Sequence, residues 1–285
     1  MSSLAPAAAS PVDRVRLGVL GWPVSHSRSP AIQNAALAVV GLAGWRYQLL
    51  PVSPELLAPT VRALPGAGFR GVNVTIPHKQ AALALAGQAT DTARAIGAAN
   101  VLTIGPGGEL TAANTDAPAL IGSLPFTPAG RTALVLGAGG SARAAVWALL
   151  DAGAAEVRVW NRTSERARRL CAELGGTPVQ DAEPADLLIN CTSSGLDAAE
   201  RTFDQLPLDA DQLVGYECVV DLVYTGSSRP GTPLARAARA RKLAVVDGLE
   251  LLVGQGALSF EIFTGLSAPI GTMRAAARGD RHPPE

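Results

Sequence analysis

Lysine is nearly missing from this chain. Only Lys79 and Lys242 are lysine among 24 basic residues, which leaves 22 arginines (24 minus 2). Arginine does not release its proton in a protein, whereas lysine does when its pKa is lowered. Lys242 lies in the arginine-rich helix end ARAARARK, where chance explains it. We therefore expect Lys79 to be kept for proton chemistry.

Cysteine and histidine are also rare. The cysteines Cys171, Cys191 and Cys218 are odd in number and have no CxxC spacing, which argues against a disulfide framework and a zinc site. A reducing cytoplasm is the simplest compartment for such a chain. Neither His26 nor His78 has metal-ligand spacing or a Cys or Glu cluster beside it, so we expect turn residues and no metal.

Long apolar runs and an excess of one charge are absent as well. No uninterrupted apolar stretch approaches the ~18 residues that span a bilayer. Basic and acidic residues balance at 24 each, without a basic run, which argues against nucleic acid or an anionic membrane as partner. The initial MSSLAPAAASP lacks a basic start and an apolar core, so we expect a frayed tail and no signal peptide.

The chain is long and apolar enough for two α/β domains, with 285 residues of which 48% are apolar. Short β-rich runs alternate with Ala/Leu-rich helical stretches. The predicted strands are 16–21, 45–52, 71–77, 132–137, 157–161, 186–191, 219–224 and 243–248. A Pro- and Gly-rich break at 122–131 separates two units. Because a helical stretch after Gly248 can cross back, we expect one domain from 1–117 plus 248–285 and a second from 118–247.

The strongest local signal is a glycine-rich turn between a strand and a helix, in VLGAGGSARAAVWALL. The turn is built from Gly137, Ala138, Gly139, Gly140 and Ser141. Small residues let the backbone approach a pyrophosphate, whose charge lies against the free N–H groups of the helix start. Because a second strand follows at the right distance, this GxGxxA match predicts a dinucleotide site more strongly than a merely structural turn.

The next strand ends without the acidic residue that binds the ribose 2′-hydroxyl of NAD. It offers Asn161, Arg162 and Thr163, with Arg166 one turn further along. Guanidinium groups bind a 2′-phosphate, which a carboxylate would repel. The sequence therefore favours NADP over NAD; the alternative is that Arg162 only begins a solvated helix.

Three polar segments of the first unit end strands or open helices, where ligands gather in open α/β sheets. GWPVSHSRSP brings Ser27 and Ser29, which are suited to bind a carboxylate or to cap a helix. NVTIPHK and AANTDAPAL place Lys79 and Asp116 at two helix starts. If the two side chains meet, they form a proton donor and relay for carbonyl reduction by a nicotinamide. If they do not, Lys79 is a solvated first-turn residue and Asp116 an N-cap.

Taken together, these segments resemble the shikimate dehydrogenase family over nearly the whole chain. The resemblance rests on GWPVSHSRSP, GVNVTIPHK, GAANVLT, NTDA, GAGGSARA, NRT, NCTSSG, DLVY and GLELLVGQGALSF, all in the family's order. It implies two α/β domains separated by a cleft: a substrate domain with a mixed sheet and a Rossmann-like NADP-binding domain. It also implies an oxidoreductase that reduces 3-dehydroshikimate to shikimate with NADPH, in aromatic amino-acid biosynthesis.

The resemblance also implies roles for individual residues. Lys79 would be the catalytic acid/base and Asp116 its partner, while Ser27 and Ser29 would take the substrate carboxylate. The substrate pocket would be completed by Thr75, Asn100, Tyr224 and Gln255. The cofactor would contact the glycine turn and the segment Asn161 to Arg166, and its nicotinamide end would lie near Thr192, Ser193, Leu222 and Gly248, with Asp91 as a weaker candidate.

Two alternatives stay open. A quinate/shikimate dehydrogenase that uses NAD is disfavoured by Arg162 and by the serine pair. A non-catalytic sensor on the same scaffold is disfavoured because Lys79 and Asp116 are both present and no DNA-binding segment is seen. The expected partners are the small-molecule substrate and NADP, in a cytoplasmic monomer or homodimer.

Replacing Arg162 by Ala should weaken the binding of NADPH much more than that of NADH, because only NADPH carries the 2′-phosphate. Michaelis constants for both cofactors, measured on the variant and on the wild type, test this expectation. Equal weakening of the two would contradict the 2′-phosphate assignment.

Overall fold

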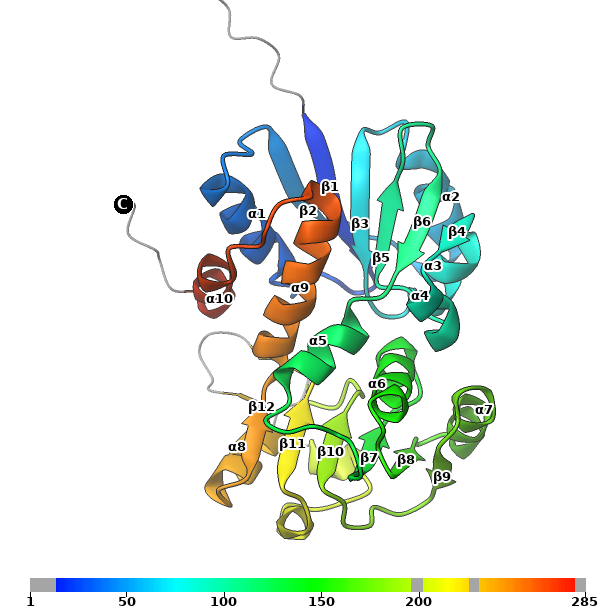
Figure 1. The fold of residues 1–285 in the computed structure, drawn as a ribbon, viewed down its shortest axis with the longest axis vertical. Helices are drawn as coiled ribbons and strands as arrows, with labels where there is room; N and C mark the ends of the chain where they lie inside the picture. Colours follow the sequence, from blue (N-terminus) through cyan, green and yellow to red (C-terminus); the bar gives the residue numbers. More distant parts are fainter. Residues whose placement is uncertain (1–13, 196–201, 226–230, 280–285) are drawn as a thin grey trace, which may run out of the picture.

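The computed structural model describes residues 14–195, 202–225 and 231–279. These residues form two six-stranded sheets covered by helices, one above the other in Figure 1. The arrangement confirms the predicted α/β fold class, with a mixed first sheet and a Rossmann-like second sheet. The predicted tail at residues 1–11 lies outside the described residues.

The first sheet is mixed, in the order β2-β1-β3-β5-β6-β4. Its strands are β1 (Val15–Gly21), β2 (Trp45–Pro51), β3 (Phe69–Val74), β4 (Gln88–Ala89), β5 (Val101–Ile104) and β6 (Leu110–Ala113). β1 pairs in parallel with β2 and β3, and these three match predicted strands. β5 runs antiparallel to both β3 and β6. The sequence did not predict β4 to β6. These strands have two to four residues, too few to show a period-2 pattern, and Gln or Thr interrupts their apolar character.

Both faces of this sheet are covered, because successive side chains of β1 point to opposite sides. Leu17 and Val19 pack with helices α1, α9 and α10, whereas Leu20 packs with α2 and α3 on the other face. The helices around the sheet are α1 (Ser29–Val39), η1 (Pro54–Leu56), α2 (Leu57–Ala63), α3 (Lys79–Leu85), α4 (Asp91–Ile96), α9 (Gly248–Thr264) and α10 (Ile270–Arg278).

The second sheet is all parallel, in the order β12-β11-β10-β7-β8-β9. Its strands are β7 (Thr132–Leu136), β8 (Glu156–Trp160), β9 (Thr177–Val179), β10 (Leu187–Asn190), β11 (Cys218–Asp221) and β12 (Ala244–Val246). From β7 the chain proceeds outward to β8 and β9, then returns to β10 on the other side of β7. β7 and β10 are therefore neighbours from which the chain leaves toward opposite edges of the sheet. Open α/β sheets bind ligands at such a point.

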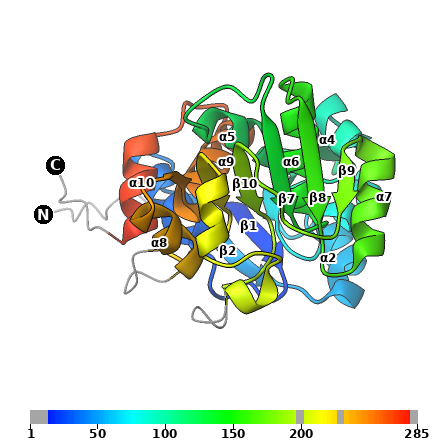
Figure 2. The same ribbon diagram turned by 90° about the horizontal axis from the view of Figure 1, so that it is seen from below.

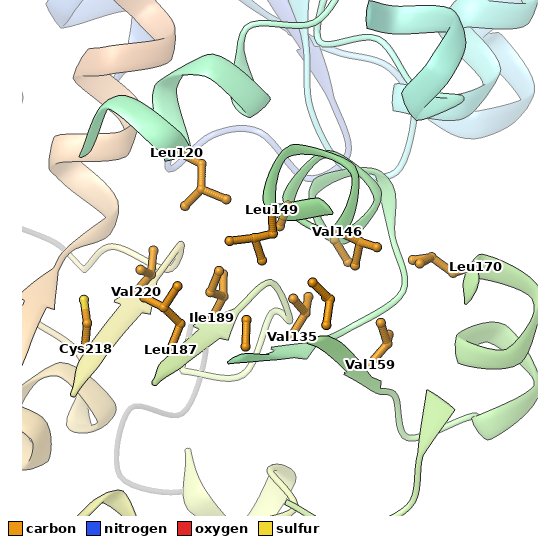
Figure 3. Close-up of a cluster of buried hydrophobic side chains, with 14 of the residues drawn as sticks. Leu120, Val135, Val146, Leu149, Val159, Leu170, Leu187, Ile189, Cys218 and Val220 are labelled. Carbon is orange, nitrogen blue, oxygen red and sulfur yellow. The ribbon is translucent and has the colours of Figure 1, made fainter. Parts of the chain in front are cut away.

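Helices bury both faces of the second sheet. On one face, Val146 and Leu149 of α6 lie above Val135 and Ile189 of the strands (Figure 3). Seen from below in Figure 2, α7 and α8 lie toward opposite edges. Burial on both faces explains why these strands read as almost continuous apolar runs. The helices here are α6 (Gly140–Asp151), α7 (Ser164–Leu174), η3 (Phe203–Gln205), η4 (Asp211–Gly215) and α8 (Pro233–Ala240).

Two helices join the sheets. α5 (Asp116–Ser123) packs on α9 and also on α6 (Figure 1). Leu120 of α5 and Leu251 of α9 belong to the apolar core of the second sheet. The expected division between residues 117 and 118 falls within α5, and α9 begins at Gly248. These two helices therefore set how the sheets stand relative to each other.

None of the helices in the described part has both the length and the apolar character needed to span a bilayer. The same residues contain no group of three or more His, Cys, Asp or Glu side chains that could hold a metal ion. The three cysteines are free thiols.

A buried carboxylate ends β11. Asp221 accepts hydrogen bonds from Asn190 Nδ2 (2.9 Å), from the Val223 N–H (3.1 Å) and from the Thr232 hydroxyl. Burial raises the pKa of Asp221 to about 6, and these hydrogen bonds act in the opposite direction. Because Thr232 also caps α8, the carboxylate ties β10, β11 and α8 together.

We expect the contribution of Asp221 to stability to fall as the pH rises from about 4 to about 6. In the folded protein the carboxyl group keeps its proton up to about pH 6, whereas the unfolded chain loses it near 3.8, so ionisation favours unfolding. The melting temperature of the wild type minus that of Asp221→Asn should therefore decrease across this range. A difference that stays constant or grows would contradict the raised pKa.

Candidate active site

Lys79 is held at the start of α3, directly after β3. The turn between them is closed by the His78 N–H, which donates to the Thr75 carbonyl (2.9 Å). The buried His78 ring lies with Nε2 2.7 Å from the Val52 carbonyl oxygen, so His78 is the turn residue that the sequence predicted. The Lys79 carbonyl accepts from the Ala99 N–H (2.8 Å). The backbone of the lysine is thus fixed from two sides.

Asp116 is the first residue of α5, but its side chain does not cap the helix. Asn114 Oδ1 accepts the N–H groups of Asp116 (3.0 Å) and Ala117 (3.3 Å) instead. The Asp116 carboxylate faces Lys79, and Oδ2 lies 2.7 Å from Nζ. The two side chains are 12% and 17% exposed, so water screens the ion pair little. Lys79 is therefore not solvated, and the structure brings the predicted pair together.

Asn100 holds the other oxygen of the carboxylate. Its Nδ2 donates to Asp116 Oδ1 (2.9 Å) and to the Thr115 hydroxyl (2.8 Å), while its Oδ1 accepts from the Thr115 N–H (2.7 Å). Gln255 of α9 joins the group with Oε1 3.3 Å from Asn100 Nδ2. Because both carboxylate oxygens have partners, the orientation of Asp116 toward the lysine is fixed.

Hydroxyl groups gather at another part of the same cavity. Ser27 and Ser29 are joined by an Oγ–Oγ hydrogen bond of 3.2 Å, and Ser27 Oγ also accepts the N–H of Ser29, the first residue of α1 (3.3 Å). Tyr224 interacts with Ser27, and the fully buried Tyr47 interacts with Ser29. Burial raises the pKa of both tyrosines above the ordinary value, so both keep their protons. Neutral hydroxyl donors of this kind suit a carboxylate.

Apart from the buried Tyr47, these hydroxyl groups line one small cavity of about 170 Å³, together with the Lys79–Asp116 pair. Every predicted catalytic and substrate-binding residue lies in its wall: Ser27, Ser29, Thr75, Lys79, Asn100, Asp116, Tyr224 and Gln255. The sequence reasoning missed Asn73, a buried residue of β3 that also lines the cavity. It accepts from the Tyr47 hydroxyl (2.8 Å) and donates to Ser259 Oγ (2.8 Å). The sequence offered one indication of Asn73, a single amide side chain within the apolar strand segment GVNV.

The glycine turn lies beside this cavity, between β7 and α6. Gly137 has a φ of +111°, and a Cβ there would come 3.1 Å from the carbonyl group of Cys191, just after β10. A Cβ on Gly140 would lie 2.6 Å from Lys79 Cβ. A Cβ on Gly139, in contrast, would meet no atom within 4 Å. The turn is therefore packed against its neighbours at Gly137 and Gly140 and opens onto free space at Gly139.

A larger cleft of about 600 Å³ lies along the turn. Its wall includes Ala138, Gly139, Gly140, Ser141, Thr192, Ser193 and Leu222 among the predicted cofactor residues. α6 begins here, and its positive end favours an anion. The volume and the open Gly139 backbone fit a dinucleotide with its pyrophosphate on the turn. Lys79, Ser141 and Leu222 line both the cleft and the small cavity, so the two spaces meet at the lysine.

Arginines form part of the cleft wall, though not all of those that the sequence singled out. Arg166 lines the cleft, whereas Arg162 is exposed and stands outside the wall with Asn161 and Thr163. Arg169 also lines it and was missed. The spacing could have revealed this residue, since positions three apart share one face of a helix.

Arg143 is a second missed arginine in the cleft wall. Its buried side chain donates from Nε to the Ile96 carbonyl (2.7 Å) and pairs with Glu173 through Nη1 (2.6 Å). It therefore connects α6 to α4 of the first sheet and to α7.

Three more of the predicted cofactor residues lie outside the cleft wall: Gly137, which is packed against Cys191, Asp91 and Gly248. Asp91 is fully exposed at the start of α4, where it pairs with Arg94 (2.7 Å), and it lines neither space. Gly248 lines the small cavity instead, and a Cβ there would come 2.7 Å from the carbonyl oxygens of Leu222 and Val223. Only glycine fits at this start of α9.

We expect Gly139→Ala to weaken NADP⁺ binding at least about tenfold without lowering the melting temperature of the free protein. The added methyl group would enter free space in the fold, but this space is where the pyrophosphate is expected. Fluorescence titration and thermal unfolding measure the two effects.

The matched control for this prediction is Gly271→Ala, an exposed helix position whose Cβ would also meet no atom within 4 Å. This variant should bind NADP⁺ like the wild type and be slightly more stable, because Ala favours a helix. Unchanged NADP⁺ binding by Gly139→Ala would contradict the assignment of the turn.

Comparisons with known proteins match one family in successive parts of the chain. Family models match as the shikimate dehydrogenase substrate binding domain over residues 19–102, as shikimate/quinate 5-dehydrogenase over 124–199 and as the shikimate 5′-dehydrogenase C-terminal domain over 248–278. Shikimate dehydrogenase (NADP⁺) from Paracoccus denitrificans is 43% identical over 261 residues, which cover 87% of this chain and 90% of the relative.

A second relative of the same name, from Methylobacterium radiotolerans, is 44% identical over 266 residues, with 88% of this chain and 91% of the relative covered. Among solved structures, shikimate 5-dehydrogenase from Thermus thermophilus, in complex with NADP(H) and shikimate, matches with a TM-score of 0.80 and 40% identity. The match covers 94% of this chain and 100% of that one. From its sequence and its fold alike, this chain belongs to the shikimate dehydrogenase family.

Proposed function

We propose that this chain is an NADP-dependent shikimate dehydrogenase, which reduces the ring ketone of 3-dehydroshikimate to the hydroxyl group of shikimate in the shikimate pathway. The observation that carries the proposal is the Lys79–Asp116 ion pair of 2.7 Å, with Lys79 in the wall shared by the small cavity and the cleft. The relatives that bear this name, and the Thermus thermophilus complex with NADP(H) and shikimate, support it.

The substrate would lie in the small cavity. Its carboxylate would accept hydrogen bonds from Ser27, Ser29 and Tyr224, whose hydroxyl groups line one part of the wall. Its ring hydroxyls would contact Thr75, Asn100, Asp116 and Gln255, which line the part near the lysine. Placing the charged group and the ketone in separate parts of a rigid cavity orients the ketone before any chemistry occurs.

Lys79 would supply the proton in this reaction. When NADPH is bound, its nicotinamide supplies the hydride that reduces the carbonyl carbon. The Lys79 ammonium group donates a proton to the carbonyl oxygen as negative charge develops there, so the product leaves as a neutral hydroxyl group. Asp116 holds the ammonium group in place before the transfer. The neutral amine then recovers its proton from water, and in the reverse direction it takes the proton from the hydroxyl group of shikimate.

The cleft would hold the cofactor. The backbone N–H groups of Gly137 to Ser141 would bind the pyrophosphate at the start of α6. Thr192, Ser193, Leu222 and Gly248 would surround the nicotinamide end. For the 2′-phosphate we propose the segment from Asn161 to Arg166, of which Arg166 lies in the cleft wall and the exposed Arg162 is close in sequence. Guanidinium groups there explain a preference for NADP over NAD.

We also propose that residues 1–117 plus 248–285 form the substrate domain and that 118–247 form the NADP-binding domain. The two sheets support this division, since β1 to β6 lie within the first part and β7 to β12 within the second. We propose a reducing cytoplasm as the compartment, with which the free thiols of Cys171, Cys191 and Cys218 are consistent, and a monomer or homodimer as the oligomeric state.

Lys79→Ala should lower kcat by about 10²- to 10⁴-fold while changing the KM values modestly, because proton donation matters mainly in the transition state. Oxidation of shikimate by NADP⁺, followed through the absorbance of the reduced nicotinamide, measures both constants. Near-normal turnover by the variant would rule out the assigned role.

The other lysine provides a matched control. Lys242→Ala removes an exposed amine just after α8 and should turn over like the wild type. The same assay with quinate and with NAD⁺ addresses the oxidative alternative: turnover with this pair that exceeds turnover of shikimate with NADP⁺ would favour a quinate enzyme.

A further inference from the structure

A second group besides Asp116 contacts the amine of Lys79. Ser141 Oγ, in the glycine turn, accepts a hydrogen bond from Lys79 Nζ at 2.9 Å. Lys79 begins α3, which covers the first sheet, whereas Ser141 lies in α6, which covers the second. This hydrogen bond therefore connects the two halves of the molecule at the lysine itself.

The carbon chain of the lysine also lies against the backbone of the turn. A Cβ on Gly140 would lie 2.6 Å from Lys79 Cβ and 3.0 Å from Lys79 Cδ, which is too close for carbon atoms unless one of them moves. Gly140 does not have a positive φ, so its backbone does not require glycine. The constraint at this position is space for the lysine side chain.

We infer that Gly140 and Ser141 position the amine of Lys79, so that the cofactor-binding half of the molecule completes the acid/base of the substrate-binding half. This inference rests on the proposed role of Lys79 as proton donor. An ammonium group has three N–H donors. Asp116 Oδ2 accepts one (2.7 Å) and Ser141 Oγ accepts a second (2.9 Å), which leaves the third for the substrate oxygen. Once two donors are held, tetrahedral geometry determines the direction of the third.

Ser141 is therefore a positioning residue in this scheme. Without its hydroxyl group, Lys79 keeps its ion pair with Asp116, but its side chain is held at one point fewer, so Nζ can move away from the position in which the third N–H faces the substrate. Fewer bound substrates then meet a correctly oriented proton, which lowers kcat and leaves both KM values close to those of the wild type. A serine that served only as a pyrophosphate ligand would act differently: its loss would raise the KM and Kd for NADP⁺ and leave kcat unchanged.

The test compares Ser141→Ala and Ser141→Thr with the wild type in the oxidation of shikimate by NADP⁺. We expect Ser141→Ala to lose about tenfold in kcat, as for one hydrogen bond to a charged group, with both KM values within about twofold. Ser141→Thr keeps a hydroxyl group and should recover most of that loss. The Kd for NADP⁺, from quenching of tryptophan fluorescence, should stay near the wild-type value in both variants.

Gly140→Ala tests the second contact. Its methyl group would displace the lysine side chain, so kcat should fall further than in Ser141→Ala. Gly271→Ala, in the exposed helix α10, serves as the matched glycine control and should turn over normally. Gly140→Ala with wild-type kcat would show that the turn does not constrain Lys79.

The outcomes separate this inference from the proposed function. A rise in the KM and Kd for NADP⁺ at constant kcat in Ser141→Ala would overturn the positioning role, as would equal losses in the Ala and Thr variants. If the wild type and Ser141→Ala turn over equally while Lys79→Ala is inactive, the positioning role fails and the proposed function stands. If the wild type does not oxidise shikimate with NADP⁺, the proposed function itself fails.

Discussion

The candidate active site depends on one shielded ion pair, between Lys79 and Asp116. Charges taken out of water are costly, and a pair of this kind is stable only when its remaining donors and acceptors are also hydrogen-bonded. Here Asn100 satisfies the second carboxylate oxygen, and Ser141 accepts a second N–H of the amine. The pair therefore requires α3, α5, α6 and the start of β5 to meet at one point, which the packing of the two sheets has to provide.

A chain of buried polar groups extends from this pair across the first sheet. Asn100 and Ser259 both contact the Thr115 hydroxyl, Asn73 donates to Ser259, and the Tyr47 hydroxyl donates to Asn73. Within the described residues, Gln33 Oε1 is the one buried side-chain polar atom without a hydrogen-bond partner. A satisfied network of this extent holds its members rigidly, because any departure leaves a buried polar group unpaired. The shape of the small cavity is thus already set by the fold.

The cleft is organised by a different constraint, the close approach of backbones. The order of the parallel sheet places the loop after β7 beside the loop after β10, so the Cβ of any other residue at Gly137 would press on the Cys191 carbonyl. Gly248 is similarly closed in by the carbonyl oxygens after β11. α5 and α9 pack against both sheets, and this packing places Lys79 against the glycine turn. Small residues at these points allow two ligand spaces to meet at one side chain.

Patterns of neighbouring residues predicted the strands of both sheets except β4 to β6 and β9, and they predicted the strand–turn–helix signal of Gly137 to Ser141. Composition singled out Lys79, because lysine is rare in this chain. β4 to β6 and β9 were not predicted, because their two to four residues are too few to show a period-2 pattern and Gln, Thr or Pro interrupts their apolar character. The folded chain was needed to show that Lys79 meets Asp116, that Ser141 reaches the same amine, and that Arg169 lines the cleft while Arg162 does not. These contacts join elements far apart in the chain, and their distances are set by how helices pack on the two sheets, which no local pattern of residues encodes.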